Sequence, residues 1–193
     1  LDLLEEYGVK KEKIIMVEPL RYKIINYKSE NINLSEKLSI LVLGSYVKEV
    51  TEDLVLIINK LSNELDFDYK FRPHPGQIIQ NKFNNFKYDL SKNLSNAISR
   101  HNVMIVAGDS SVAIDVYLAK KELLIYLKKG DLNYSPLRNN KNVNFLYNEE
   151  SIREYISNLI FKYKTNKNSL EINNIQKMYI EDNTNSKWKK LIG

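Results

Sequence analysis

The chain has 193 residues, of which 43% are hydrophobic and 27% are charged, and its 29 basic and 24 acidic side chains leave a net charge of +5. This length fits one ordinary globular domain or two small ones. The lack of cysteine excludes a disulfide framework, a thiolate metal centre and a cysteine nucleophile, and two histidines leave little for another metal site. No apolar run approaches the ~20 residues of a membrane-spanning helix, so we expect a cytoplasmic protein. We also expect that it uses no metal or other cofactor.

The surplus positive charge lies mainly near the C-terminus. From Lys162 onward seven lysines accompany three acidic residues, which accounts for four of the five surplus charges. A solvated basic surface is therefore favoured over a nucleic-acid interface. A basic tail is also attracted to an anionic inner-membrane surface, so peripheral membrane contact is a further expectation.

The first 36 residues are a predicted lead-in, with an apolar stretch around Ile14 to Val17 and a polar linker from Ser29 to Glu36. Leu38 to Leu43 is then a continuous apolar run that ends at Gly44. This pattern is typical of a strand that is buried on both faces and followed by a turn. Apolar residues with helical spacing follow from Thr51 to Leu65, and Thr51 is expected to help cap that helix.

From residue 69 to residue 163, short apolar runs that predict strands alternate with amphipathic segments that predict helices. The further strands are expected at Tyr69–Phe71, Phe86–Leu90, Val103–Ala107, Glu122–Leu127 and Val143–Tyr147. The further helices are expected at Leu94–Arg100, Val112–Ala119 and Ile152–Tyr163. Short right-handed connections predict a doubly wound, mostly parallel α/β sheet of about five or six strands over residues 37–165, with a basic helical tail over residues 166–193.

Polar residues that follow the strands are the candidate site, because ligands of open α/β sheets bind outside the carboxyl ends of the strands. Gly44 and Ser45 follow the first strand, and Arg72, His74 and Pro75 follow the second. A proline on each side of His74 ends that strand and makes the turn rigid. Arg72 is suited to pair with phosphate oxygens, and His74 to bind or protonate a leaving phosphate. The alternative is that His74 bonds a backbone carbonyl in a tight loop.

A second polar group, Gly108, Asp109, Ser110 and Ser111, begins the helix after the fourth predicted strand. Glycine admits a close backbone approach, and two hydroxyls beside free helix amides favour a phosphate ligand. Ordinary N-capping by one of these polar residues is the alternative. Asp115 lies about one helical turn further on and is expected either to accept hydrogen bonds from a sugar hydroxyl or to be a surface charge.

The remaining candidates are secondary. The polar loop that contains Lys128–Gly130 and Asn133–Arg138 closes over a base or sugar, or is a plain connection. His101, at a predicted helix end, is interpreted as a cap. The sequence has no Gly-x4-Gly-Lys-Ser/Thr and no Gly-x-Gly-x-x-Gly pattern, which argues against a nucleoside triphosphatase and a nicotinamide enzyme.

With His74-Pro75 followed by Ser110-Ser111 further along, the chain resembles the C-terminal domain of a GT-B glycosyltransferase, and in particular bacterial sialyltransferases and related Kdo and capsule transferases. The resemblance implies that His74 contacts the donor phosphate, that Pro75 shapes its loop and that both serines bind phosphate. It also implies that Asp115 is directed toward the donor ribose. Ala119–Lys121 stands where many members have Ala-Gly-Lys-Pro, so the glycine and proline of that motif are missing.

The segment Pro19–Tyr22, the Leu132–Arg138 loop and Trp188 are similar to parts of surface-carbohydrate biosynthesis proteins. The resemblance implies a nucleotide-sugar donor, for instance a CMP-activated acidic sugar, and a glycan or lipid-linked acceptor. It places the catalytic base on an N-terminal domain of the same chain, which we expect outside this sequence. The alternatives are a non-hydrolysing nucleotide-sugar epimerase, a CDP-glycerol transferase, or a non-catalytic interaction module whose glycines are turns and whose serines are caps.

Overall fold

The computed structural model describes residues 2–15, 37–77, 87–165 and 186–192. The chain divides into two compact units, one made of Leu1–Ile25 and Gln176–Gly193 and the other of Asn26–Ile175. The predicted lead-in and tail therefore contribute to one unit, although they come from opposite ends of the chain. The motif at Pro19–Tyr22, the linker Ser29–Glu36 and most of the basic tail lie outside the described residues.

Short helices make up the described part of the first unit. They are α1 (Asp2–Glu6), the 3-10 helix η1 (Lys11–Lys13) and α6 (Ser186–Ile192). Within the predicted tail the structure describes α6, which carries Trp188 together with three lysines.

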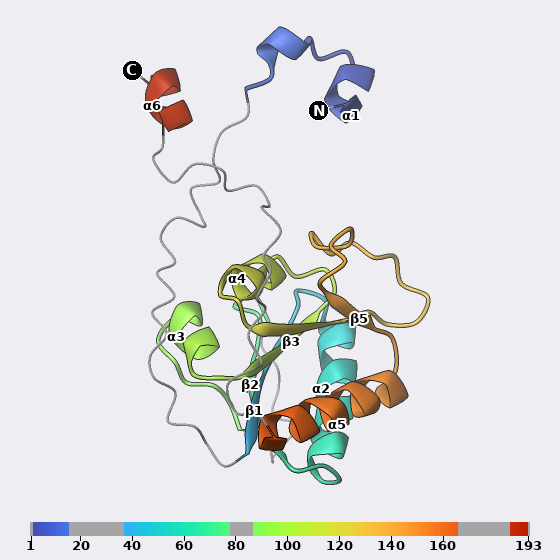
Figure 1. The fold of residues 1–193 in the computed structure, drawn as a ribbon. Coiled ribbons are helices and arrows are strands. Elements are labelled where there is room, and N and C mark those ends of the chain that lie inside the picture. The colour runs from blue at the N-terminus through green and yellow to red at the C-terminus, as the bar shows by residue number, and fades with distance from the viewer. Residues whose placement is uncertain (1, 16–36, 78–86, 166–185, 193) are drawn as a thin grey trace. The chain divides into compact units, whose positions relative to one another are not determined.

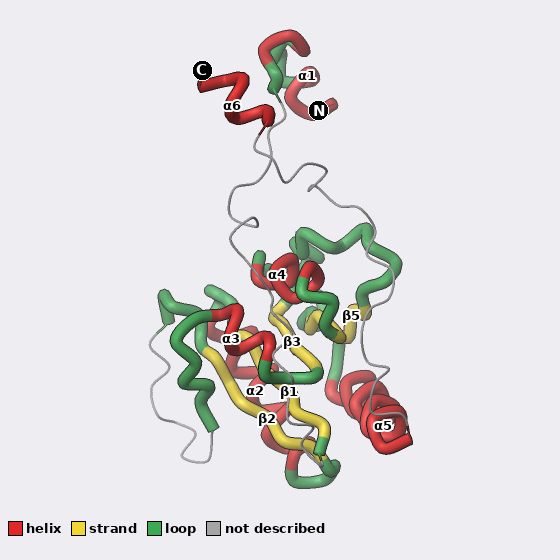
Figure 2. Tube along the Cα trace, turned by 60° about the vertical axis from the view of Figure 1, so that its left-hand side comes forward, coloured by secondary structure: helices red, strands yellow, loops and turns green. Residues whose placement is uncertain are grey.

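The second unit is built on a five-stranded sheet in which every strand runs parallel to its neighbours, in the order β2-β1-β3-β4-β5 (Figure 1). The strands are β1 (Leu38–Leu43), β2 (Phe67–Arg72), β3 (Val103–Ala107), β4 (Glu122–Tyr126) and β5 (Asn144–Leu146). Figure 2 shows β1 and β2 side by side. The doubly wound α/β sheet predicted from the sequence is thus confirmed, and the fold is Rossmann-like.

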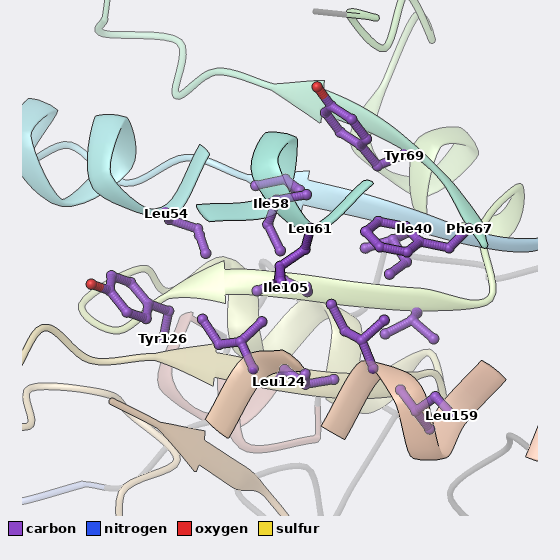
Figure 3. Close-up of a cluster of buried hydrophobic side chains, with 14 of the residues drawn as sticks. Ile40, Leu54, Ile58, Leu61, Phe67, Tyr69, Ile105, Leu124, Tyr126 and Leu159 are labelled. Carbon is purple, nitrogen blue, oxygen red and sulfur yellow. The ribbon is translucent and has the colours of Figure 1, made fainter. Parts of the chain in front are cut away.

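Helices cover both faces of the sheet, as the near-continuous apolar strands require. The four helices are α2 (Lys48–Ser62), α3 (Leu94–Ser99), α4 (Val112–Leu118) and α5 (Glu149–Thr165). In Figure 1, α2 and α5 lie on one side of the sheet and α3 and α4 on the other. On the first side, alternate strand residues such as Ile40, Ile105 and Leu124 pack with Leu54 of α2 and Leu159 of α5 into one buried cluster (Figure 3).

The strand predicted at Phe86–Leu90 is wrong, because the structure contains only an isolated bridge between Tyr88 and Phe71 there. Asp89 turns inward to meet Arg72, and Leu90 is exposed, so the pairing does not continue. The bridge nevertheless lies on the free side of β2, because Val42 of β1 pairs with Phe71 from the opposite side. Counted as a rudimentary strand, it gives the order 3-2-1-4-5-6 of doubly wound dinucleotide-binding sheets.

The cap predicted for the helix at Thr51–Leu65 is also wrong. Helix α2 begins at Lys48, its N-cap is Val47, and no side chain caps it. Thr51 is buried inside the first turn, where its hydroxyl accepts a hydrogen bond from the backbone amide of Ser45 at 3.0 Å. This bond to the turn before α2 occupies the hydroxyl, which therefore does not cap the helix.

Candidate functional site

The loops after β1, β2 and β3 lie at one edge of the sheet, because the carboxyl ends of parallel strands share an edge. From β1 the chain crosses to β2 on one side, and later returns to place β3 on the other side of β1. The strand order therefore reverses between β1 and β3. Gly44 follows β1 and Gly108 follows β3, so two of the three predicted polar groups flank the point at which doubly wound sheets bind ligands.

The loop after β1 packs directly against the loop that contains His74. The amide of Gly44 donates to the carbonyl oxygen of Arg72 at 3.0 Å. A Cβ atom on Gly44 would lie 3.2 Å from the backbone nitrogen of His74 and 3.1 Å from Cγ2 of Thr51. A side chain at position 44 would therefore require the backbone at His74 or the side chain of Thr51 to shift by a few tenths of an ångström.

His74 has one ring nitrogen bonded within its own loop and one available to a ligand. Its Nδ1 accepts a hydrogen bond from the amide of Gly76 at 3.1 Å. The ring also meets Tyr46 edge to face, with 5.7 Å between centroids. Because Nδ1 is the acceptor, the proton of the neutral ring sits on Nε2, which becomes a hydrogen-bond donor. The alternative of a bond to a backbone carbonyl is wrong, since the loop partner is an amide.

Two residues that sequence reasoning missed help to fix this loop. The side-chain amide of Gln77 donates to the carbonyl oxygen of Tyr46 at 2.6 Å, which ties the loop after β2 to the loop after β1. Tyr46 is itself largely exposed beside His74. An exposed aromatic ring directly after a buried strand and its glycine turn is the signal that could have drawn attention to Tyr46.

Ser45, predicted to bind nucleotide, is fully buried and occupied by its own turn. Its hydroxyl accepts a hydrogen bond from the amide of Val47 at 2.8 Å, and its amide binds Thr51. These bonds shape the chain between β1 and α2. The structure thus gives Ser45 a supporting position beneath the loop.

Arg72, predicted to pair with phosphate, has an internal partner. Its Nη1 donates to Oδ2 of Asp89 at 2.7 Å and to the carbonyl oxygen of Ser91 at 2.9 Å. The side chain of Asp89 is only 2% exposed and that of Arg72 is 24% exposed. Burial by itself would raise the pKa of Asp89, but hydrogen bonds from Ser91 and Arg72 reverse this, and the pKa lies below its usual range. Arg72 therefore anchors the segment after the Tyr88 bridge to the end of β2.

The turn from Gly108 to Ser111 leads from β3 into α4. The amide of Ser110 donates to the carbonyl oxygen of Ala107 at 3.1 Å, and the Ser110 hydroxyl accepts only a long bond from the amide of Val112, at 3.4 Å. Ser111 is the N-cap but makes no side-chain capping bond. Asp109 and Ser111 are exposed. The capping alternative thus applies only weakly to Ser110, and Ser111 is engaged with its surroundings.

Gly108 permits a close approach between the ends of β3 and β4. A Cβ atom there would lie 2.1 Å from Cδ2 of Leu127 and 3.1 Å from the carbonyl oxygen of Tyr126. Asp115, further along α4, is only 1% exposed and is engaged with its surroundings. The alternative that Asp115 is a surface charge is therefore wrong, while its contact with a donor ribose stays a prediction.

His101 lies outside this edge, just after α3, where its buried Nδ1 donates to the carbonyl oxygen of Ala97 at 2.8 Å. This contact at the end of α3 agrees with the predicted capping role. Burial lowers the pKa of His101 below its usual range, although the bond to Ala97 acts in the opposite direction.

We expect His101 to make the stability of the protein depend on pH between 7.5 and 5.5. The unfolded state, with a histidine pKa of about 6.5, binds the proton more readily than the folded state. The contribution of His101 is therefore fully present above about pH 6.5 and is lost as the pH falls toward the lower folded pKa. Urea unfolding of wild type and His101→Asn, whose amide keeps a donor near Nδ1, should show a smaller loss in the variant. Equal losses would contradict this assignment.

A cluster that sequence reasoning missed lies at the end of β4. The hydroxyl of Tyr126 donates to Oδ2 of Asp53 at 2.6 Å, and Nζ of Lys128 lies 3.7 Å from the same oxygen. The Tyr126 ring closes one end of the buried cluster, with its hydroxyl pointing outward (Figure 3). Burial, together with Asp53, raises the pKa of Tyr126, so this phenol stays protonated at neutral pH. Tyr126 and Asp53 are 73 residues apart in the sequence, so no local sequence pattern could have revealed this contact.

Next to this cluster is a cavity of about 220 Å³ between the loops that follow β1, β3 and β4. It is lined by Val47, Val50, Gly108, Asp109, Tyr126, Leu127, Lys128, Asp131, Leu132 and Tyr134. Lys128 and Tyr134 belong to the polar loop at Lys128–Gly130 and Asn133–Arg138 that was a secondary candidate. Part of this loop therefore lies at the cavity.

The chain matches no protein-family model, and comparisons with curated proteins and with solved structures find no significant similarity. Among the helices of the described segments, none combines the length and apolar character needed to cross a bilayer. In the same segments, no group of three or more histidine, aspartate or glutamate side chains is arranged to hold a metal ion.

Proposed function

We propose that this chain is the donor-binding domain of a glycosyltransferase that builds bacterial surface polysaccharide, and that its Rossmann-like unit binds a nucleotide sugar. A glycan or lipid-linked acceptor, a catalytic base on an N-terminal domain and a cytoplasmic location at the inner membrane belong to the same proposal. The observation that carries it is that Gly44 packs against the His74 loop, while the Gly108–Ser111 turn follows the neighbouring strand β3 at the same carboxyl edge of the sheet. The order of strands reverses at this place.

The chemistry available there suits a leaving phosphate. Nε2 of His74 is the free donor of its ring, and the hydroxyls of Ser110 and Ser111 lie at the start of α4. Hydrogen bonds to phosphate oxygens strengthen as negative charge develops on the leaving group, so they lower the barrier of sugar transfer. We assign this stabilisation to His74. Hydrogen bonds from His74 and the serine hydroxyls to the phosphate do not depend on a metal ion.

Nucleotide binding tests the proposal through two substitutions of the same histidine. His74→Asn keeps an acceptor near Nδ1 for the Gly76 amide but removes the Nε2 donor, whereas His74→Gln restores a donor near Nε2. In isothermal titration of the full chain with CMP, CDP, UDP and GDP, His74→Asn should weaken the preferred nucleotide about 10-fold or more, as expected for a hydrogen bond to a charged group. His74→Gln should retain more of the affinity.

Ser110→Ala should also weaken the same nucleotide, and Ser157→Ala in α5, whose hydroxyl bonds only its own helix, is the matched control. Preference for CMP or CDP supports a CMP-sugar or CDP-linked donor, and preference for UDP or GDP keeps the domain assignment with another donor. Product analysis with the complete enzyme then separates a transferase from an epimerase. Absence of binding to all four nucleotides would contradict the proposal and favour a non-catalytic interaction module.

A further inference from the structure

The cavity between the loops after β1, β3 and β4 has walls of two kinds. Val47, Val50 and Leu132 contribute apolar surface, and Tyr134, which is largely exposed, contributes an aromatic side chain. Such walls suit a planar heterocycle, because aromatic and apolar side chains pack against a ring face.

Charged groups at the cavity are unequal in number. Asp109 and Asp131 line it, and Asp53 lies next to it, whereas Lys128 is the single cation among its lining residues. The Lys128 ammonium lies 3.7 Å from Asp53, which in turn accepts the Tyr126 hydroxyl. The excess of carboxylates disfavours a phosphate inside the cavity and favours groups that donate hydrogen bonds.

The loop that carries two of these charges is held in a defined shape. The amide of Asp131 donates to the carbonyl oxygen of Lys128 at 3.0 Å, and the amide of Leu127 bonds the carbonyl oxygen of Leu146 at the end of β5. Further on, Leu137 is buried and its amide bonds the hydroxyl of Ser135. The carboxylate and the ammonium therefore start from anchored backbone, which favours selective recognition over adaptable contact.

We propose that this cavity receives the base of the bound nucleotide and selects bases that carry an exocyclic amino group. The carboxylates of Asp109 and Asp131 accept hydrogen bonds from the amino group, and Lys128 donates to a ring nitrogen or carbonyl on the same edge. A base with a carbonyl at that position brings an acceptor against a carboxylate, which leaves both groups unpaired. The inference rests on the proposed function, because the Gly108–Ser111 turn would hold the adjoining phosphate.

Two matched pairs of ligands test the selection. CDP and UDP differ at the amino or carbonyl group of the pyrimidine, and ADP and IDP differ likewise in the purine. The wild-type chain should bind the amino-bearing member of at least one pair about 10-fold more tightly, because a site built for a donor rejects an analogue that lacks it. The double variant Asp109→Asn/Asp131→Asn should reduce that ratio to about one, since an amide can donate as well as accept. The single variants assign the contact, and Asp68→Asn, on the exposed face of β2, is the control.

Inorganic pyrophosphate separates this inference from the proposed function. If pyrophosphate binds but neither nucleotide pair is discriminated, or if discrimination survives in the double variant, the base selection is wrong and the phosphate site stands. If the pairs are discriminated but His74→Asn changes no affinity, the cavity is supported and the proposed phosphate contact is wrong. Absence of binding by every ligand overturns both.

Discussion

Gly108→Ala should destabilise the protein by about 1–3 kcal/mol, which is the usual cost of forcing an extra methyl group into a packed core. The new Cβ would meet Cδ2 of Leu127 at 2.1 Å and the carbonyl oxygen of Tyr126 at 3.1 Å. Leu127 is buried and its amide is bonded to β5, so its side chain can move away only toward the cavity that it lines together with Gly108. Urea unfolding followed by circular dichroism measures the loss, and nucleotide affinity should fall with it because the Gly108–Ser111 turn is displaced.

A second substitution shows whether this collision is the cause. Leu127→Ala alone should cost about 2–5 kcal/mol, as for other buried leucines. It also removes the atom that the new methyl group would strike, so the double variant should be at least about 1 kcal/mol more stable than the sum of the single losses predicts. Additive losses would mean that the close approach between β3 and β4 is not what requires glycine at position 108.

Arg72→Met should lower the free energy of unfolding by about 3 kcal/mol at neutral pH. Removing one partner of a fully buried ion pair usually costs slightly more, but Arg72 keeps some exposure. The substitution leaves the buried Asp89 carboxylate with the Ser91 hydroxyl as its remaining side-chain partner. Adding Asp89→Asn removes the stranded charge while keeping an acceptor for Ser91. The double variant should therefore recover part of the lost stability, and chemical unfolding of the three variants measures this.

The loss should also depend on pH in a defined direction. In the wild type the lowered pKa of Asp89 contributes stability above about pH 3.9, and this is lost as the pH falls through the folded pKa. In Arg72→Met, burial is no longer opposed by the guanidinium, so the pKa of Asp89 rises and the carboxylate protonates earlier. The stability difference between wild type and Arg72→Met should shrink between pH 7 and pH 4. A difference that grows toward pH 4 would show that Arg72 acts through something other than the carboxylate of Asp89.

Most of the sheet could be predicted because its strands are buried on both faces. Runs such as Leu38–Leu43 and Val103–Ala107 are apolar at nearly every position, which few other structures require. The strand predicted at Phe86–Leu90 was wrong because Asp89 pairs with Arg72 at the sheet edge. These residues are 17 positions apart, so a local pattern does not reveal their contact. The start of α2 was also predicted wrongly. The amide of Ser45 binds the Thr51 hydroxyl, which the sequence pattern had indicated as a helix cap.

The candidate site could be predicted only as far as strand ends allow. The positions of Gly44, His74 and the Gly108–Ser111 turn follow from where the strands end, and the structure brings the first two within contact. The local pattern cannot show which side chains already have internal partners, so it overrated Ser45 and Arg72. It also cannot show a cavity whose walls come from three loops, or a bond such as that between Tyr126 and Asp53.

We expect nucleotide phosphate to bind at the carboxyl edge of the sheet, where β1 and β3 lie side by side. A nitrogen–proton NMR titration of the labelled chain with CDP tests this most directly, because each backbone amide reports its own environment. We expect the largest shifts at Gly44, Gly76 and Ser110, with little change in α5. Shifts confined to the opposite edge of the sheet, or no shifts at millimolar nucleotide, would show that nucleotide phosphate does not bind there.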